Sequence, residues 1–248
     1  MAYYNKTISI YGTELQFVQA LIAAITEADS RITCTTTDIE AQYAAGSGTP
    51  SFTLSVDGDY TIVFTRPYSV NNSVAGFKIS VPIFGNKYDK TIAYSSSTNG
   101  GLGKNQTGIR TVNLSIITNS EDVYFRIAPY NGNVVQNGLK LLSTKSGGNT
   151  IIGRGEDATN IMTTVFVTAD SSNQAYTTVN RIPYTYAPTG SAGVEVLQNK
   201  VFLENTSSNR AFTLSKLWDV STVAADSRVV IGSDTFYAVD SHTLMLIE

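Results

Sequence analysis

His242 is the only histidine among the 248 residues of the chain, and it lies two residues after Asp240. Histidine is the usual general base of hydrolases, so a Ser-His-Asp triad could recruit this pair. The sequence lacks the strand-turn-helix pattern that presents a serine nucleophile in many such enzymes. We therefore expect His242 to be a turn residue at a strand end, and we predict no catalytic residue. A hydrolase is the least favoured of three functional hypotheses.

Cys34 is the only cysteine, so no disulfide can form within the chain. A zinc site would have to combine Cys34 and His242, which lie far apart in the sequence, with several carboxylates. The stretch around Cys34, Thr-Cys-Thr, is instead typical of a strand that carries a small buried hydrophobic residue. The sequence therefore predicts no metal site and no reactive thiol.

The Gly-rich segment 100–104 is similar to part of a phosphate-binding loop. That loop requires glycine at position 98 and serine or threonine after the lysine, whereas this chain has Thr98 and Asn105. Neighbouring acidic residues such as Asp57 and Asp59 cannot face each other across a cleft, as glycoside hydrolysis requires. We expect turns and exposed loops at these positions, and we predict no cofactor.

Tyrosine is abundant, with 14 residues against 10 phenylalanines and one tryptophan. Tyrosine is enriched at protein interfaces, but it also fills strand faces. Tyr3 and Tyr4 are candidate interface residues. Tyr184 and Tyr186 flank a single threonine, so both rings would lie on one side of a strand, and they are candidate ligand-binding residues. They could stack on a sugar or contact a subunit, and the sequence leaves both possibilities open.

A helix is predicted from Thr13 onward, because Thr13 and Gln16 have the spacing of a capping box. Apolar residues then recur at spacings of three and four, which predicts one apolar stripe along the helix. The stripe consists of Leu15, Val18, Leu21, Ile22, Ile25 and Ala28. It must pack against a sheet or a neighbouring subunit, and Leu15, Val18 and Ile22 are therefore interface candidates.

Residues 52–64 predict a β-hairpin in which apolar residues alternate with polar ones on both sides of an acidic turn. A two-residue turn would put the two apolar sets on opposite faces of the sheet. A three-residue loop pairs Val56 with Tyr60, Leu54 with Ile62 and Phe52 with Phe64, and so gives one apolar face. We therefore prefer the three-residue loop, which would require Asp59 to adopt a left-handed backbone conformation.

Alternating, β-branched segments predict strands over most of the remaining chain. The expected strands are 77–84, 111–118, 123–128, 161–169, 174–186, 194–197, 200–204, 211–220, 228–231, 235–239 and 243–247. A mainly β fold follows, with antiparallel β-sandwich or barrel-like domains and one N-terminal amphipathic α-helix.

Breaks in composition predict three parts. Residues 1–49 would form an N-terminal strand-helix docking segment, residues 50–188 a β-rich body, and residues 194–248 a small C-terminal β domain. The boundaries are set by the Gly- and Ser-rich segments that end near residues 50 and 193.

Only 15% of the residues are charged and the net charge is −3, against roughly 25% charged residues in an average domain. Without a basic excess to neutralise phosphates, the chain is not expected to bind nucleic acid. No apolar run approaches the ~20 residues that span a bilayer, so we expect no membrane insertion. The N-terminus lacks the pattern of a signal peptide, so we expect the chain to be made in a cytoplasm and to stay soluble, unless it leaves by another route such as release inside an assembled particle.

The chain resembles bacteriophage virion proteins, especially tail, baseplate and fibre components. Three features carry the resemblance: the start directly in a strand and helix, the low-charge Ser/Thr/Asn/Gly-rich β segments, and the ending 229–248 with its short strand-turn-strand pattern. The resemblance implies a non-enzymatic structural protein of the virion, made in the host cytoplasm. Its partners would be copies of itself and other virion proteins, in symmetric assemblies.

A receptor- or carbohydrate-binding β-sandwich module is the alternative interpretation. Such a module would use exposed tyrosines and the polar loop 95–108 to bind a host surface glycan.

Overall fold

The computed structural model describes residues 2–45, 48–66, 75–87, 89–95, 102–129, 138–146, 148–156, 161, 164–167, 175–178, 196–203, 211–220 and 222–247. Within these residues the chain is mainly β, and the strand pairs whose register is determined are antiparallel. The predicted fold class is confirmed.

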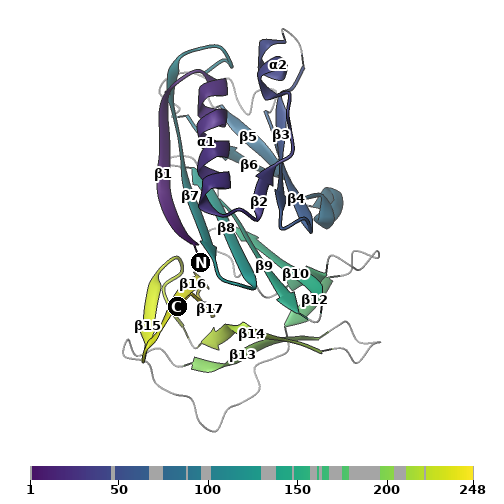
Figure 1. The fold of residues 1–248 in the computed structure, drawn as a ribbon, viewed down its shortest axis with the longest axis vertical. Helices are drawn as coiled ribbons and strands as arrows, with labels where there is room; N and C mark the ends of the chain where they lie inside the picture. Colours follow the sequence, from purple (N-terminus) through teal and green to yellow (C-terminus); the bar gives the residue numbers. More distant parts are fainter. Residues whose placement is uncertain are drawn as a thin grey trace. The chain divides into compact units, whose positions relative to one another are not determined.

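The described strands form two sheets (Figure 1). In order across the smaller sheet, the strands are β2 (Ile32–Cys34), β3 (Ser51–Val56), β4 (Tyr60–Thr65), β5 (Gly76–Ser80) and β6 (Asp89–Ala93). In order across the larger sheet, they are β1 (Ala2–Gly12), β7 (Gly108–Thr118), β8 (Asp122–Pro129), β9 (Leu139–Ser146), β10 (Asn149–Glu156), β11 (Thr164–Val167), β12 (Ala175–Thr178), β13 (Val196–Leu203), β14 (Ala211–Val220), β17 (Thr243–Leu246), β16 (Asp234–Asp240) and β15 (Arg228–Ile231).

The chain divides into two compact units. We call residues 4–116 and 126–139 the N-terminal unit, and residues 1–3, 117–125 and 140–248 the C-terminal unit. The N-terminal unit contains most of the predicted docking segment 1–49 together with much of the predicted body 50–188. The predicted boundary at residues 189–193 lies outside the described residues.

In the N-terminal unit, helix α1 (Glu14–Ala28) packs against an aromatic face of the smaller sheet. The ring of Phe17 stacks on Phe77 of β5 with 6.0 Å between centroids, and Phe52 stacks on Phe64 at 4.5 Å. Gly76 permits the close approach of β5 and β6, because a Cβ atom there would lie 2.5 Å from the carbonyl oxygen of Ile92. The predicted capping box of α1 is present.

The hairpin of β3 and β4 has the predicted three-residue loop, with Val56 opposite Tyr60 and Phe52 opposite Phe64. The prediction for Asp59 was wrong. The residues with positive φ are Asp57 (53°) and Gly58 (73°), and the amide of Asp59 closes the turn on the carbonyl of Val56 at 3.0 Å. Aspartate and glycine tolerate left-handed backbone better than most residues, which explains why the positive φ angles fall at Asp57 and Gly58.

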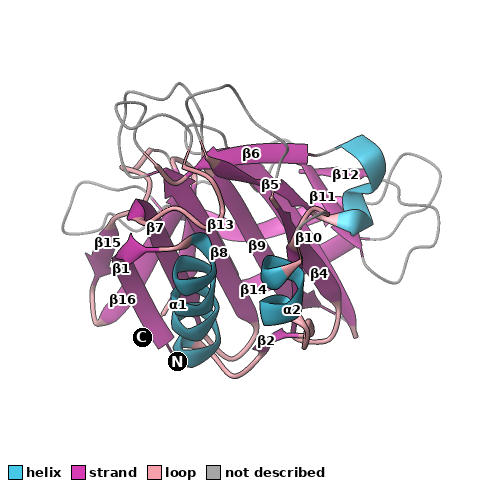
Figure 2. Cartoon of the chain, turned by 90° about the horizontal axis from the view of Figure 1, so that it is seen from above, coloured by secondary structure: helices cyan, strands magenta, loops and turns pink. Residues whose placement is uncertain are grey.

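Other local differences have physical causes. The expected strand 77–84 ends at Ser80, and a 3-10 helix, η1 (Pro82–Lys87), follows it, since Pro82 has no amide to continue the ladder. The short helix α2 (Ile39–Ala44), which lies beside α1 (Figure 2), was not predicted. The expected strands 194–197 and 200–204 are one strand, β13, whose register shifts interrupt the alternation.

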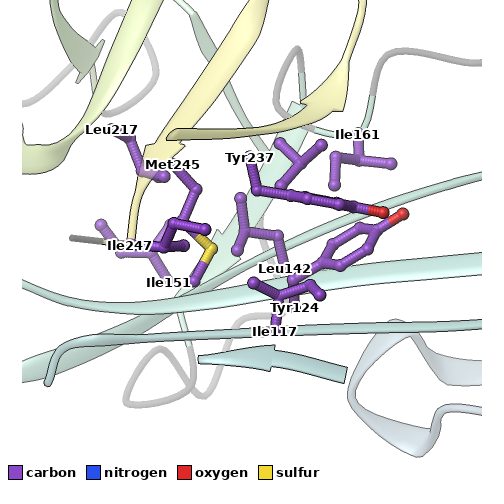
Figure 3. Close-up of a cluster of buried hydrophobic side chains, with 10 residues drawn as sticks. Ile117, Tyr124, Leu142, Ile151, Ile161, Leu217, Tyr237, Met245 and Ile247 are labelled. Atoms are coloured by element: carbon purple, nitrogen blue, oxygen red, sulfur yellow. The ribbon is translucent and has the colours of Figure 1, made fainter. Parts of the chain in front are cut away.

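In the C-terminal unit, residues from strands that are distant in the sheet order meet in one core (Figure 3). Its members are Ile117, Tyr124, Leu142, Ile151, Ile161, Leu217, Tyr237, Val239, Met245 and Ile247. The rings of Tyr124 on β8 and Tyr237 on β16 are 5.4 Å apart. Within this unit the strands on either side of the core therefore face each other, a sandwich-like packing.

Candidate functional site

Strand β1 ends the order of the larger sheet, and among the described strands it pairs with β7 alone. It is eleven residues long, and its residues at odd positions are exposed. Tyr11 is 76% exposed. An edge strand presents unpaired backbone amides and carbonyls, which can template the addition of another strand. The edge of β1 is therefore a candidate interaction surface.

Uncharged side chains tie the exposed face of β1 to β7. The Thr7 hydroxyl donates to Asn113 Oδ1 at 2.8 Å, and the Ser115 hydroxyl donates to Asn5 Oδ1 at 3.2 Å. These two pairs advance in opposite directions along the strands, as antiparallel pairing requires. Ser9 and Thr111 share a hydrogen bond of 2.8 Å between them.

The next pair in this register places Tyr11 opposite Ile109, and both side chains are largely exposed, at 76% and 55%. We call residues 5, 7, 9 and 11 of β1 with residues 109, 111, 113 and 115 of β7 the β1 ladder. Its β1 side chains are exposed, whereas Thr111 and Ser115 of β7 are buried, so the hydrogen-bonding groups open to solvent are mainly those of β1, with Tyr11 and Ile109 exposed at one end. It carries no formal charge, so a partner could bind there without desolvating an ion of this surface.

The opposite face of β1 is packed inward only in part, since Lys6 on this face is exposed. Ile8 is buried, and Lys6 Nζ lies 5.7 Å from the ring centre of Tyr4. Burial and the negative charge of Glu27 on α1 raise the pKa of Tyr4. One face of β1 is thus held by α1, while the ladder face points outward.

A buried charge cluster fixes the corner where β1 turns into α1. Glu14, the first residue of α1, is fully buried, and its carboxylate has two donors. Tyr43 donates its hydroxyl to Oε1 at 2.9 Å, and Arg66 donates Nε to Oε2 at 2.8 Å. We call Glu14, Tyr43, Arg66 and the neighbouring Tyr94 the Glu14 cluster.

The electrostatics of the Glu14 cluster favour the protonated forms of Tyr43, Tyr94 and Arg66. Burial, followed by the charge and hydrogen bond of Glu14, raises the pKa of Tyr43 far above its ordinary value, and burial and Glu14 also raise that of Tyr94. Burial alone would lower the pKa of Arg66, but the hydrogen bond and charge of Glu14 outweigh it and raise the pKa. The Tyr94 hydroxyl interacts electrostatically with Glu14, although it makes no hydrogen bond of ordinary geometry among the described residues.

Arg110 on β7 closes the same corner from the other side. It is fully buried and donates Nη1 to the carbonyl of Gly12 and Nη2 to the carbonyls of Gly103 (3.1 Å) and Gln106 (3.0 Å). The amide of Glu14 donates to the carbonyl of Lys104 at 3.1 Å. The end of β1 is therefore anchored by buried hydrogen bonds. Because Glu14 is enclosed and paired, the cluster suits structural anchoring better than acid–base chemistry.

The predicted interface residues occupy different environments. Val18 is fully buried in the core of the N-terminal unit, so a partner cannot reach it while this unit is folded. Leu15 and Ile22 are half-buried, because the inward face of α1 also takes Glu14 and Phe17. Of the two N-terminal tyrosines, Tyr4 is half-buried.

Tyr3 lies in the C-terminal unit and is 46% exposed. Its ring packs edge-on against Tyr237, with 6.0 Å between centroids, and the guanidinium of Arg228 lies 5.4 Å from its centre. Tyr3 is therefore accessible to solvent, and its role at an interface stays a prediction.

The remaining candidates give no chemical site in the described part of the chain. Tyr184 and Tyr186 lie outside the described residues. The Asp240 carboxylate accepts hydrogen bonds from the backbone amides of His242 (2.8 Å) and Ile161 (3.0 Å), as a turn-stabilising aspartate does. Cys34 Sγ lies 3.7 Å from the carbonyl of Thr36.

Sequence reasoning missed the β1 ladder and the Glu14 cluster. The alternation of Asn5, Thr7 and Ser9 with Ile8 and Ile10 was a usable signal for a strand with one uncharged polar face. The cluster had no such signal, since Glu14 and Arg66 are 52 positions apart in the sequence.

Comparison with known proteins found no matching family model, no similar curated protein and no similar solved structure. Among the described residues, no helix combines the length and the apolar character needed to cross a membrane. A search of the same residues for three or more acidic, histidine or cysteine side chains placed to hold a metal ion also found none.

Proposed function

We propose that this protein is a non-enzymatic structural component of a phage virion or tail-like particle and that it acts through protein–protein assembly. The observation that carries the proposal is the outer edge of β1, which no other described strand covers. Natural proteins usually shield an edge strand with charges, proline or a bulge. The eleven residues of β1 contain one charged residue, Lys6, and no proline.

The first occupant of this edge is a second copy of the same chain. Antiparallel pairing of two β1 strands about a two-fold axis at Thr7 places Asn5 opposite Ser9 of the other copy and Thr7 opposite itself. These are polar, uncharged pairs that suit a continuous ladder. The two Lys6 side chains lie diagonally on the other face, exposed to water, where salt screens their repulsion. A two-fold contact of this kind is the commonest way in which identical subunits associate.

The virion setting is supported by the resemblance of the chain to phage structural proteins and by its low charge. Uncharged Ser, Thr and Asn on outward strand faces allow contact over a large area without a heavy desolvation penalty. The anchoring of the corner at Glu14 and Arg110 supports the same role, because a rigid edge loses little conformational freedom when a partner binds.

The test is the oligomeric mass in solution, measured by light scattering over a range of concentrations. Wild type is expected to associate, and Thr7→Lys is expected to be monomeric because two lysines would lie directly opposite each other. Thr7→Val, which keeps the shape and the strand preference, should still associate. Mixing Thr7→Lys with Thr7→Glu should restore the pairing.

Two results would contradict this proposal. A wild-type monomer at all concentrations would rule out self-association, and an unchanged mass for Thr7→Lys would rule out the β1 edge. Mass spectrometry of purified particles from a producing phage or locus tests the virion setting separately, since a chain absent from the particles cannot be a structural part of them.

A further inference from the structure

Lys140 and Asp226 form a close pair inside the C-terminal unit. Lys140 Nζ lies 3.0 Å from Asp226 Oδ2, and the lysine side chain has no exposed surface. Asp226 is 23% exposed at its side chain. Lysine is almost never fully buried unless it is paired, and among the described residues the amine pairs with this carboxyl group.

Two tyrosine hydroxyls hold the other oxygen of the same carboxylate. Tyr124 donates to Asp226 Oδ1 at 2.7 Å and Tyr237 donates to it at 3.3 Å. Figure 3 shows the two hydroxyl oxygens side by side at the ends of their rings. The carboxyl group thus has an amine at one oxygen and two hydrogen-bond donors at the other.

The backbone keeps Asp226 in this position. Its φ is +60°, in the left-handed region that aspartate tolerates better than most residues. Its amide donates to the carbonyl of Ala238 at 2.7 Å, and the amide of Ala238 donates to the carbonyl of Ser227 at 2.9 Å. These bonds fix the loop before β15 on β16, so the Asp226 carboxyl group is held beside the Lys140 amine.

We propose that Lys140 and Asp226 become joined by an intramolecular amide bond. A proton passes from the ammonium group to Asp226 Oδ2 within the existing hydrogen bond, which leaves a neutral amine and a carboxylic acid. The amine lone pair then attacks Cγ, the C–N bond forms, and the carbonyl electron pair moves to Oδ1. The hydroxyls of Tyr124 and Tyr237 stabilise the negative charge there, as an oxyanion hole does.

The reaction is completed when a second proton moves from nitrogen to Oδ2 and the C–Oδ2 bond breaks. Oδ2 leaves as water with the two transferred protons, and the electron pair on Oδ1 restores the carbonyl. One ammonium and one carboxylate therefore give one amide and one water, with no oxidant or cofactor.

The amide bond would join β9 to the loop before β15, which lie far apart in the order of the larger sheet. It would resist unfolding as a disulfide does, by closing a long loop of chain. Cys34 is the only cysteine, so this chain cannot obtain the same constraint from an internal disulfide.

The test is the intact mass of the folded wild-type protein, compared with that of Lys140→Arg. Wild type should be lighter by one water after allowance for the substitution, and Lys140→Arg and Asp226→Ala should show no loss. Trypsin cannot cleave after an acylated lysine. The wild-type digest should therefore contain peptide 127–145 joined to peptide 217–228, with both flanked by ordinary cleavage sites.

Tyr124→Phe should form the same product about ten- to a hundredfold more slowly, because one of the two donors to Oδ1 is missing. The proposal is overturned if the wild-type mass shows no water loss and peptides 127–140 and 217–228 are recovered separately. A water loss confined to peptide 217–228 would also overturn it, because that result indicates a succinimide at Asp226. The wild-type measurement decides the question even if a variant fails to fold.

Discussion

Each unit of the protein contains a carboxylate that accepts hydrogen bonds from a tyrosine hydroxyl and from a cation, and the two clusters differ in which partner is fully buried. In the N-terminal unit the acid, Glu14, is fully buried and Arg66 is 26% exposed. In the C-terminal unit the cation, Lys140, is fully buried and Asp226 is 23% exposed. Both pairs join a carboxylate to a cation, but solvent reaches the cation in the N-terminal unit and the carboxylate in the C-terminal unit.

The choice of cation decides what each cluster can become. A guanidinium keeps its protons at any ordinary pH, so the Glu14 cluster can only be an ion pair. A lysine can give up a proton and then act as a nucleophile. The same arrangement of carboxylate and tyrosine can therefore anchor a corner in one unit and become a covalent link in the other.

Removal of the cation from the N-terminal unit should have the largest effect on stability. Arg66→Met leaves a fully buried carboxylate without its countercharge. We expect a loss of about 2 to 3 kcal/mol in the free energy of unfolding, below the ~3–5 kcal/mol of a fully buried pair because water screens Arg66 in part. Urea unfolding followed by circular dichroism measures it.

The control for Arg66→Met is the double variant with Glu14→Gln, which removes the orphaned charge and should recover much of the loss. Arg66→Lys should stay close to wild type. If Arg66→Met unfolds at the same urea concentration as wild type, the Glu14 cluster is not an anchor.

Removal of one hydroxyl from the cluster should have a smaller effect, with a distinct pH dependence. Tyr43→Phe leaves Glu14 Oε1 without this donor, and we expect a loss of about 1 kcal/mol at neutral pH. The pKa of Tyr43 is raised in the folded protein from its ordinary value of 10.0. The fold therefore favours the neutral phenol, and this stability is complete below that value and lost as the pH rises above it.

Unfolding curves at neutral pH measure the loss of the hydrogen bond, and curves above about pH 10 measure the stability lost when Tyr43 ionises. Wild type should lose stability more steeply than Tyr43→Phe over this alkaline range, because both proteins contain Tyr94, whose pKa is also raised, and only wild type adds Tyr43. Equal alkaline slopes for the two proteins would show that Tyr43 is not held neutral by burial beside Glu14.

The parts of the fold that could be predicted from the sequence are those encoded locally. The cap of α1 depends on Thr13 and Gln16, three residues apart, and the register of the β3–β4 hairpin follows from alternation around one turn. Both predictions were confirmed. The conformation of Asp59 was not, because a three-residue loop can be closed with positive φ at different positions.

The clusters could not be predicted, because their partners are distant in sequence. Glu14 and Arg66 are 52 positions apart, and Lys140 and Asp226 are 86 apart. A single glutamate at the start of a helix predicts an exposed residue that stabilises the helix through its dipole. The neighbouring residues in the sequence give no indication that it is buried. Such pairs are set by tertiary packing.

Amide hydrogen exchange of residues 2–12, measured at low and high protein concentration, tests the assembly role of β1 most directly. Pairing of two β1 edges would bury the outward amides in hydrogen bonds, so exchange in this segment should slow as concentration rises. Thr7→Lys should show no such change. Exchange in residues 2–12 that is the same at every concentration in wild type would contradict assembly through the β1 edge.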